Sequence, residues 1–187
     1  AGQRLTANRT IESFYKWSGG GRIPIFCDTT SCTHTLLFET GGDILTPENR
    51  EKYKQLKIMD ITQWLKEVVL PRIKVIRPKN RILLHPTCSC QIMGLTPVLL
   101  DIARKCAREV ILPDNWGCCG ASGDRGFIFP ELSDSATRDE RDEIGHESFD
   151  GCYSLARTCE IAMQDHIEQP YESIVYLVDE TIQDQGT

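Results

Sequence analysis

Residues 81–90 read RILLHPTCSC, an apolar run that ends in a turn rich in Thr, Ser and Cys. A helical pattern follows at residues 95–107, so this part of the chain predicts a strand, a turn and a helix in succession. The same phrase occurs earlier: residues 25–37 read IFCDTTSCTHTLL, and residues 83–95 read LLHPTCSCQIMGL. We therefore expect an internal duplication, in which each cysteine-bearing turn follows the carboxyl end of a strand.

Strand and helix patterns alternate along the rest of the chain. Further strands are expected at residues 57–59, 110–112 and 149–153, and further helices at residues 61–69, 133–144 and 157–167. Residues 173–178 fit either a strand or the start of a last helix. This alternation predicts an α/β fold with two similar Rossmann-like halves, in which a parallel or mixed sheet is covered by helices.

The predicted organisation has three segments. Residues 1–21 end in three consecutive glycines and read as a linker or a helix tail from an upstream domain. Residues 22–80 form the first, degenerate half. Residues 81–187 form the second half, which carries the main cysteine motif.

Composition excludes several classes of partner. The chain has 187 residues and a net charge of −6, without a cluster of Lys and Arg, which argues against nucleic acid or an anionic membrane surface as the partner. No apolar run approaches the roughly 18 residues of a membrane span, and the polar start AGQRLTANRT lacks the apolar core of a signal peptide. We expect no transmembrane segment and a reducing, cytoplasmic location.

The chain contains nine cysteines. As a share of the residues they fall below the roughly 8–10% of a disulfide scaffold, and their number is odd. In a reducing compartment, clustered thiols indicate metal binding or redox chemistry.

Two of these cysteines are adjacent, in the stretch GCCGASGDRG at residues 117–126. Neighbouring cysteines close into a disulfide only with strain, whereas their diverging thiolates can bind different irons of one cluster. The glycines in this stretch permit positive φ, which exposes backbone N–H groups to the negative sulfurs of an iron–sulfur cluster. Gly117, Gly120 and Gly123 are therefore candidates for the cluster-binding loop. The dinucleotide fingerprint G-x-G-x-x-G is absent.

The other cysteines come from several loops that a sheet edge would bring together. The candidates for further ligands are Cys32, Cys88, Cys90, Cys152 and Cys159. Cys106 shares a helix face with Leu99 and Ile102 and is expected in the core, and Cys27 fits either the core or the surroundings of the site. Because His34 and His85 flank candidate ligands, a mixed zinc site stays open as an alternative.

Five segments together resemble a known family. They are PIFCDTTSCTHTLL (24–37), HPTCS (85–89), GCCGASGDRGFIFPELSDSAT (117–137), RTCEIAM (157–163) and PYESIVYLVDETI (170–182). They resemble the cysteine-rich CCG domain, in the version found at the C-terminus of large FAD-linked, iron–sulfur D-lactate or D-2-hydroxy-acid dehydrogenases. Wider members include the heterodisulfide reductase catalytic subunit. The resemblance covers nearly the whole chain from about residue 22 onward.

The resemblance implies a set of cluster ligands. Cys88 matches the first cysteine of the family motif, and Cys118 and Cys119 match its double cysteine. The closing CxxC pair of the family is absent, and we choose Cys159 over Cys152 because Cys159 lies in the matching RTCEIAM. Cys32, in the turn of the first half, is a candidate fifth ligand. Four thiolates suffice for a cubane [4Fe–4S] cluster, and five would permit the non-cubane type. Since the first half has no CCG, we expect one cluster.

The resemblance also implies a function. The chain would be an electron-transfer domain that passes electrons from a flavin toward an external acceptor of unknown identity. FAD and ferredoxin-like clusters would lie in upstream domains of the same polypeptide, so the 187 residues alone are expected to be inactive as a dehydrogenase. The whole enzyme would be cytoplasmic or peripheral to the membrane. The alternatives are a zinc-stabilised structural module and a thiol-redox site like that of heterodisulfide reductase.

Overall fold

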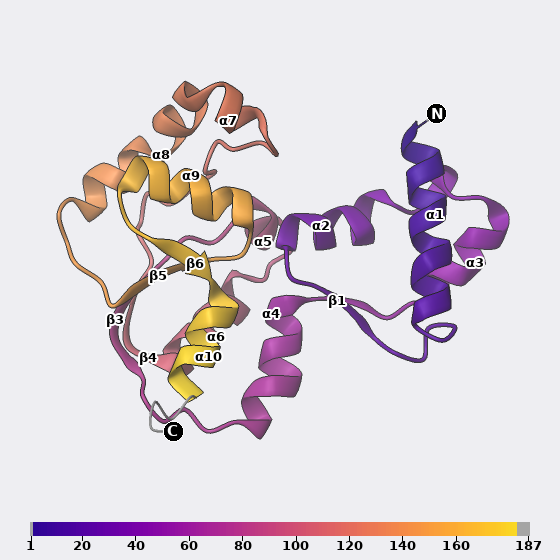
Figure 1. Cartoon of the computed structure of the whole chain (residues 1–187), viewed down its shortest axis with the longest axis horizontal. Coiled ribbons are helices and arrows are strands. Elements are labelled where there is room, and N and C mark those ends of the chain that lie inside the picture. The colour runs from indigo at the N-terminus through magenta and orange to yellow at the C-terminus, as the bar shows by residue number, and fades with distance from the viewer. Residues whose placement is uncertain (1, 183–187) are drawn as a thin grey trace. The chain divides into compact units, whose positions relative to one another are not determined.

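The computed structural model describes residues 2–182 (Figure 1). The chain forms two compact units, Ala1–Ile61 and Thr62–Thr187, and each is described here by itself. The sequence analysis placed the division between residues 80 and 81; the structure divides the chain after Ile61. Residue 1 and residues 183–187, the ends of the predicted segments, lie outside the described residues.

The first unit is built on a two-stranded parallel sheet. Strand β1 (Ile25–Cys27) pairs with β2 (Ile58–Asp60), with Ile25 opposite Ile58. The helices of this unit are α1 (Gly2–Trp17), α2 (Thr30–His34), which continues as a π-helical turn (Thr35–Glu39), a 3₁₀ turn (Gly42–Ile44) and α3 (Pro47–Gln55).

The segment expected as a linker or helix tail is packed within this unit. The buried Asn49 of α3 donates hydrogen bonds to Asn8 Oδ1 over 2.9 Å and to Glu12 Oε1 over 3.1 Å, both on α1. At Gly21 the backbone has a φ of +83°, and an added Cβ would come within 2.1 Å of the Gln55 carbonyl oxygen. Gly21, the last of the three consecutive glycines, is therefore required because the backbone at Gln55 approaches it closely.

The second unit contains a four-stranded sheet in the order β4-β3-β5-β6, and every neighbouring pair is parallel. The strands are β3 (Lys79–Leu84), β4 (Ala107–Ile111), β5 (Gly151–Ser154) and β6 (Tyr171–Ser173). Leu83 on the central strand lies opposite Ile111 on one side and Cys152 on the other. The two parallel sheets, with helices around them, confirm the predicted α/β class.

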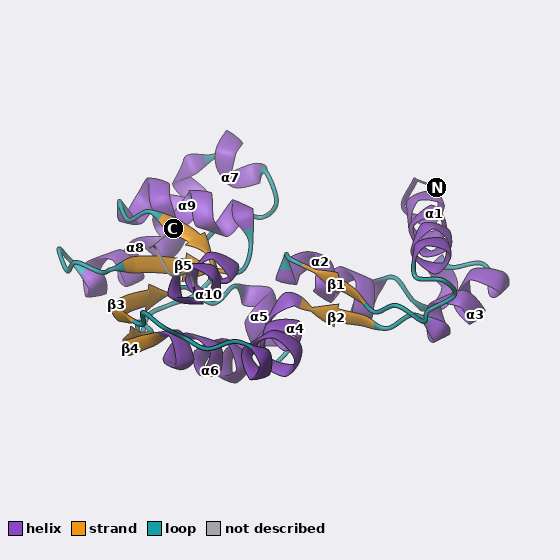
Figure 2. Ribbon diagram, turned by 60° about the horizontal axis from the view of Figure 1, so that its bottom comes forward, coloured by secondary structure: helices purple, strands orange, loops and turns teal. Residues whose placement is uncertain are grey.

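Helices cover both faces of this sheet. The helices from Ile61 onward are α4 (Ile61–Trp64) with a π-helical turn (Leu65–Val69) and a 3₁₀ turn (Leu70–Arg72), α5 (Cys88–Ile92), α6 (Thr96–Cys106), α7 (Arg125–Ile128), α8 (Pro130–Ile144), α9 (Arg157–Ile167) and α10 (Ile174–Ile182). Helices α8 and α9 pack together on one face, and α6 lies on the other (Figure 2). None of the helices in the described part is long and apolar enough to span a membrane.

Local chemistry explains several of these boundaries. The Thr87 hydroxyl accepts a hydrogen bond from the Cys90 amide over 3.2 Å and so begins the short helix α5, where the sequence predicts only a turn. Of the two forms predicted for residues 173–178, the helix is the one observed, because β6 ends at Ser173 and α10 begins at Ile174. Cys106 is fully buried on α6, which confirms its predicted place in the core.

Candidate metal centre

Three adjacent strands bring four cysteines to one edge of the second unit's sheet. Cys88 begins α5 after β3, Cys118 and Cys119 lie in the loop after β4, and Cys159 lies in the first turn of α9 after β5. Because β4, β3 and β5 are parallel neighbours, their carboxyl ends lie at the same edge. Segments that are 30 to 40 residues apart in the sequence can therefore meet there (the separation of Cys119 and Cys159 is 40).

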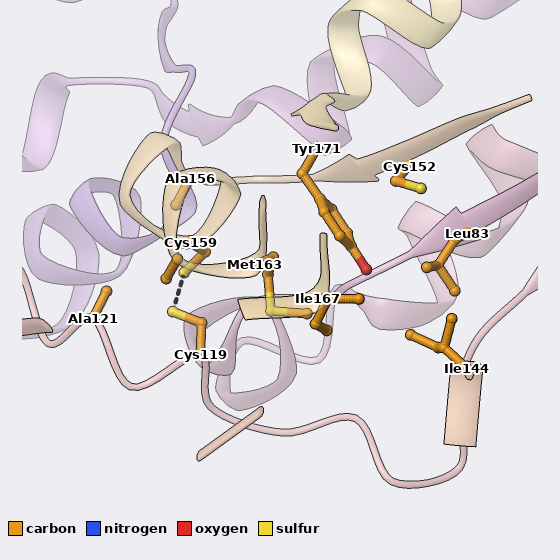
Figure 3. Packing of buried hydrophobic residues seen from close by; sticks show 11 residues of the cluster. Leu83, Cys119, Ala121, Ile144, Cys152, Ala156, Cys159, Met163, Ile167 and Tyr171 are labelled. Atoms are coloured by element: carbon orange, nitrogen blue, oxygen red, sulfur yellow. Dashed lines mark hydrogen bonds between the residues drawn. The ribbon is translucent and has the colours of Figure 1, made fainter. Parts of the chain in front are cut away.

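The four thiols form a continuous series of contacts. The Cys119 thiol donates a hydrogen bond to Cys159 Sγ over 2.9 Å (Figure 3). Cys118 interacts through its side chain with both Cys119 and Cys88. The series Cys88, Cys118, Cys119 and Cys159 contains the four residues that the family resemblance implied as ligands. Cys119 and Cys159 are buried, whereas Cys88 and Cys118 are exposed, so the site opens to solvent on one side.

Mutual contact and burial raise the pKa of Cys88, Cys118 and Cys119. For Cys119, the hydrogen bond with Cys118 lowers the pKa, but the one with Cys159 and burial outweigh it and raise the pKa to about 12. For Cys118, the hydrogen bond with Cys119 and then burial raise the pKa far above its ordinary value. Burial followed by the charge of Cys118 raises the pKa of Cys88. A thiophilic ligand must therefore displace protons when it binds.

Backbone amides oppose this effect at three of the four sulfurs. The Gly120 amide donates to Cys118 Sγ over 3.4 Å, and this bond lowers the pKa of that thiol. The Ala121 amide acts in the same direction on the pKa of Cys119, as does the Ser89 amide on the pKa of Cys88. These N–H groups favour negative charge on sulfur, and would lie around a bound anionic group.

The glycines of the loop have different roles. Gly120 has a φ of +73°, and an added Cβ would come within 2.6 Å of the Leu132 carbonyl oxygen and 2.7 Å of Ser133 Cα. The loop is thus held directly against the start of α8. Gly123 also has positive φ, at +75°, but its surroundings are open. Gly117 has neither positive φ nor a close neighbour, so its predicted contribution to the loop has no steric basis.

The donor set fits an iron–sulfur cluster. Thiolates are the ligands that such clusters require, and N–H groups directed at sulfur accompany them. Among residues 2–182, no group of three or more His, Cys, Asp or Glu side chains is arranged to hold a single metal ion. The four cysteines supply the ligand type and number that a cluster needs, and the sulfurs of Cys119 and Cys159, which are 2.9 Å apart, would have to separate to bind different irons.

Cys32, the candidate fifth ligand, lies in the first unit. It is exposed on α2 and is a neighbour of Cys27 at the end of β1. Burial raises the pKa of Cys27, a hydrogen bond with Thr33 lowers it, and the charge of Cys32 raises it further. Since the two units are described separately, the role of Cys32 as a fifth ligand stays a prediction.

The remaining candidates from the sequence have partners outside the series of four thiols. Cys90 Sγ lies 3.9 Å from Thr96 Oγ1, and Cys152 Sγ lies 3.9 Å from Gln169 Oε1; both side chains are buried. His34 pairs with Glu39 over 3.3 Å in the first unit. His85 pairs with Glu140 through Nδ1 only and its Nε2 has no partner within the described residues, so the zinc alternative is not decided by this pair.

The His85–Glu140 pair is a feature that the sequence analysis missed. His85 Nδ1 lies 2.9 Å from Glu140 Oε2, and both side chains are almost fully buried. A signal for Glu140 was present in the sequence, because Ser133, Thr137, Glu140 and Ile144 recur at helical spacing and form the buried face of α8. A carboxylate on such a face requires a partner.

An apolar surface adjoins the cysteine loop. Phe127, Ile128, Phe129 and Leu132 are between 43% and 66% exposed. They belong to α7 and the start of α8, directly after the glycines of the loop. Neighbouring apolar side chains with this much exposure are typical of a contact surface.

Comparison with known proteins adds no assignment. No protein-family model matches the chain, and a search of curated proteins finds no match.

Proposed function

We propose that this chain is an iron–sulfur electron-transfer domain that belongs to a flavin-dependent D-2-hydroxy-acid dehydrogenase. Its ligands would be Cys88, Cys118, Cys119 and Cys159, with Cys32 as a candidate fifth. The observation that carries the proposal is the continuous series of four thiols at the carboxyl ends of three parallel strands. The motif resemblance of the sequence supports the choice of cluster and parent enzyme.

The residues around the thiols have the properties that such a domain needs. When bound, a [4Fe–4S] cluster would supply a centre that accepts and releases single electrons. The amides of Ser89, Gly120 and Ala121 would donate to its negatively charged sulfurs. Burial of Cys119 and Cys159 would exclude water from one side of the centre. Hydrogen bonds to sulfur and burial are two of the factors by which proteins set reduction potentials.

The proposed partners are flavin and ferredoxin-like domains of the same polypeptide, together with an electron acceptor that is not identified. The exposed side chains of Phe127, Ile128 and Phe129 lie directly after the cysteine loop and offer a surface for such contacts. The proposed location is the cytoplasm. We do not assign hydride transfer to any residue of this chain.

The decisive experiment is metal analysis of the chain after anaerobic purification. We expect iron and acid-labile sulfide in comparable amounts, a brown colour, and an electron paramagnetic resonance signal in one of the accessible oxidation states. Cys119→Ser should lose most of the iron, whereas Cys106→Ser, the buried control, should retain it.

Three other results would overturn the proposal. Stoichiometric zinc without sulfide would identify a structural zinc module. A chain that binds neither metal after reconstitution with iron and sulfide, yet cleaves small disulfides, would identify a thiol-redox site. Equal iron loss in the Cys106 and Cys119 variants would show that the ligand assignment is wrong.

A further inference from the structure

The buried pair His85 and Glu140 connects two parts of the cysteine site. His85 Nδ1 lies 2.9 Å and 3.1 Å from the two carboxylate oxygens of Glu140, and the side chains are 1% and 2% exposed. His85 directly follows β3, whose turn carries Cys88, and Glu140 lies on α8, against which the loop with Cys118 and Cys119 packs. The pair therefore joins the two ligand-bearing segments from inside the protein.

The alternation of the strand places the His85 ring in the same packed layer as the buried thiols. Side chains two residues apart on a strand share a face, so His85 is on the side of Leu83. Leu83 belongs to the core cluster that contains Cys119, Cys159 and Tyr171 (Figure 3). The His85 ring also meets the Tyr171 ring edge-on, with the centroids 6.4 Å apart. Three peptide units separate His85 from Cys88, so their Cα atoms are at most about 11 Å apart.

One nitrogen of this imidazole has no hydrogen-bond partner. His85 Nε2 is buried without a partner in the described structure, although Nδ1 is fully engaged by Glu140. With a proton on Nδ1 and a carboxylate on Glu140, the pair carries one negative charge, and Nε2 has an open lone pair. A second proton on Nε2 would make the pair neutral. The pair can thus change its charge by one unit at a defined atom without rearranging.

Tyr171 on β6 is the titratable group that faces both members of the pair, and Cys152 on β5 lies near Tyr171. Cys119 in the loop after β4 and Cys159 on α9 belong to the same core cluster as these two residues. Burial and then the charge of Glu140 raise the pKa of Tyr171, so its hydroxyl stays protonated. Burial raises the pKa of Cys152 to about 12, so it also stays neutral. Within residues 2–182 no lysine or arginine forms an ion pair with Glu140, which leaves His85 as the group that can compensate added charge.

We infer that the His85–Glu140 pair takes up a proton when an electron reaches the cysteine site. The inference rests on the proposed function, which supplies the electron from a flavin domain. One electron adds a negative charge at the site, and one proton from solvent binds at His85 Nε2, so the net charge of the buried layer does not change. The physical reason is that an uncompensated charge is costly in this poorly screening interior, and Nε2 is a buried basic atom without a hydrogen-bond partner in the described part of the chain. Electron transfer through this domain is therefore linked to pH.

The test is the midpoint potential of the cluster-loaded chain as a function of pH, from about pH 6 to about pH 9. We expect the potential to fall as pH rises, with proton uptake on dithionite reduction that approaches one proton per electron. In Glu140→Gln, which keeps the shape and the hydrogen bond but removes the charge, the dependence on pH should be lost. Asp139→Asn is the matched control, because it makes the same change at an exposed position next to Glu140.

The results distinguish this inference from the function on which it rests. A potential that is independent of pH in the wild-type chain, without proton uptake, overturns the linkage and leaves the electron-transfer function standing. A chain that binds no cluster overturns both. If Glu140→Gln does not fold, His85→Asn takes its place. The measurement of proton uptake by the wild-type chain on reduction tests the linkage without any variant. A purely structural pair would change iron content or stability on substitution, but not the slope of potential against pH.

Discussion

The Cys119 thiol donates a hydrogen bond to Cys159 Sγ over 2.9 Å, although 40 residues separate the two in the sequence. The contact joins the loop after β4 to the first turn of α9, and both side chains are buried. It is the innermost link in the series of four thiols. Because the two sulfurs are already 2.9 Å apart, they are positioned to form a disulfide when the thiols are oxidised.

Controlled oxidation of the metal-free chain should therefore form a Cys119–Cys159 disulfide before any other. Diamide takes up the two electrons and two protons that the thiols lose. The vicinal pair Cys118 and Cys119 should react less, because its disulfide is strained. Peptide mapping under non-reducing conditions gives the pairing, and a first-formed Cys118–Cys119 link would contradict this expectation. Cys159→Ala serves as the control.

The ligand residues should differ sharply in their effect on iron content. Replacing Cys88, Cys118 or Cys159 by Ser should remove most of the iron, as expected for Cys119, because each supplies one thiolate to the same group. Cys152→Ser, in which a buried cysteine outside the series is changed, should retain iron. Iron and sulfide assays on anaerobically purified variants measure this. If the Cys152 variant lost as much iron as the Cys159 variant, the choice between these two cysteines would be reversed.

Two glycines with the same backbone conformation should differ when changed to alanine. Gly123→Ala adds a methyl group into open space at positive φ and should cost about 1 kcal/mol of folding free energy. Gly120→Ala meets the same strain and also the backbone of Leu132 and Ser133, so we expect a loss of about 2–4 kcal/mol and lower iron content. Denaturant unfolding of both variants gives the comparison. Equal losses would mean that the loop is not held against α8.

Alkaline pH should destabilise the metal-free chain. The folded state raises the pKa of Cys152 to about 12 through burial, whereas the thiol in the unfolded chain has its ordinary pKa of 9.0. The folded state therefore binds more protons in this window, and stability is complete below about pH 9 and falls as pH rises toward 12, by up to about 1.4 kcal/mol per pH unit for this group. The pH dependence of denaturant unfolding measures this.

Cys152→Ala should make this alkaline decline shallower, even if the variant is less stable at neutral pH. Cys32→Ala, at an exposed thiol of the other unit, should leave the slope unchanged. A Cys152 variant with the wild-type slope would show that its thiol does not stay protonated in the folded state.

The purified chain alone should not oxidise D-2-hydroxy acids. This expectation follows from the family resemblance, which assigns substrate oxidation to a separate flavin domain, and from the absence of a dinucleotide fingerprint. Dye reduction assays with D-lactate and D-2-hydroxyglutarate, after a flavin content measurement, provide the check. Substrate-dependent turnover by a flavin-free preparation would refute the assignment of an electron-transfer role alone.

The sequence by itself determined the local elements and the class of chemistry. Alternating strand and helix patterns predicted the α/β class, because burial on a sheet face and on a helix face imposes different periods. The paired cysteines among glycines in residues 117–126 indicated a thiolate site, since few other roles suit adjacent thiols in a loop that permits positive φ. The sequence also predicted the turn that contains Thr87 and Cys88, although it did not predict the short helix that Thr87 begins.

Only the tertiary structure decided which distant residues meet. The strand order β4-β3-β5 brings Cys88, Cys118 and Cys159 to one edge, and no local pattern specifies that order. The same holds for the division after Ile61, and for the pairing of Glu140, on the buried face of α8, with His85, which directly follows β3. The periodicity of apolar residues indicates which face of a helix or strand is buried. It does not indicate which other element covers that face, because contacts between elements depend on the packing free energy of the whole unit.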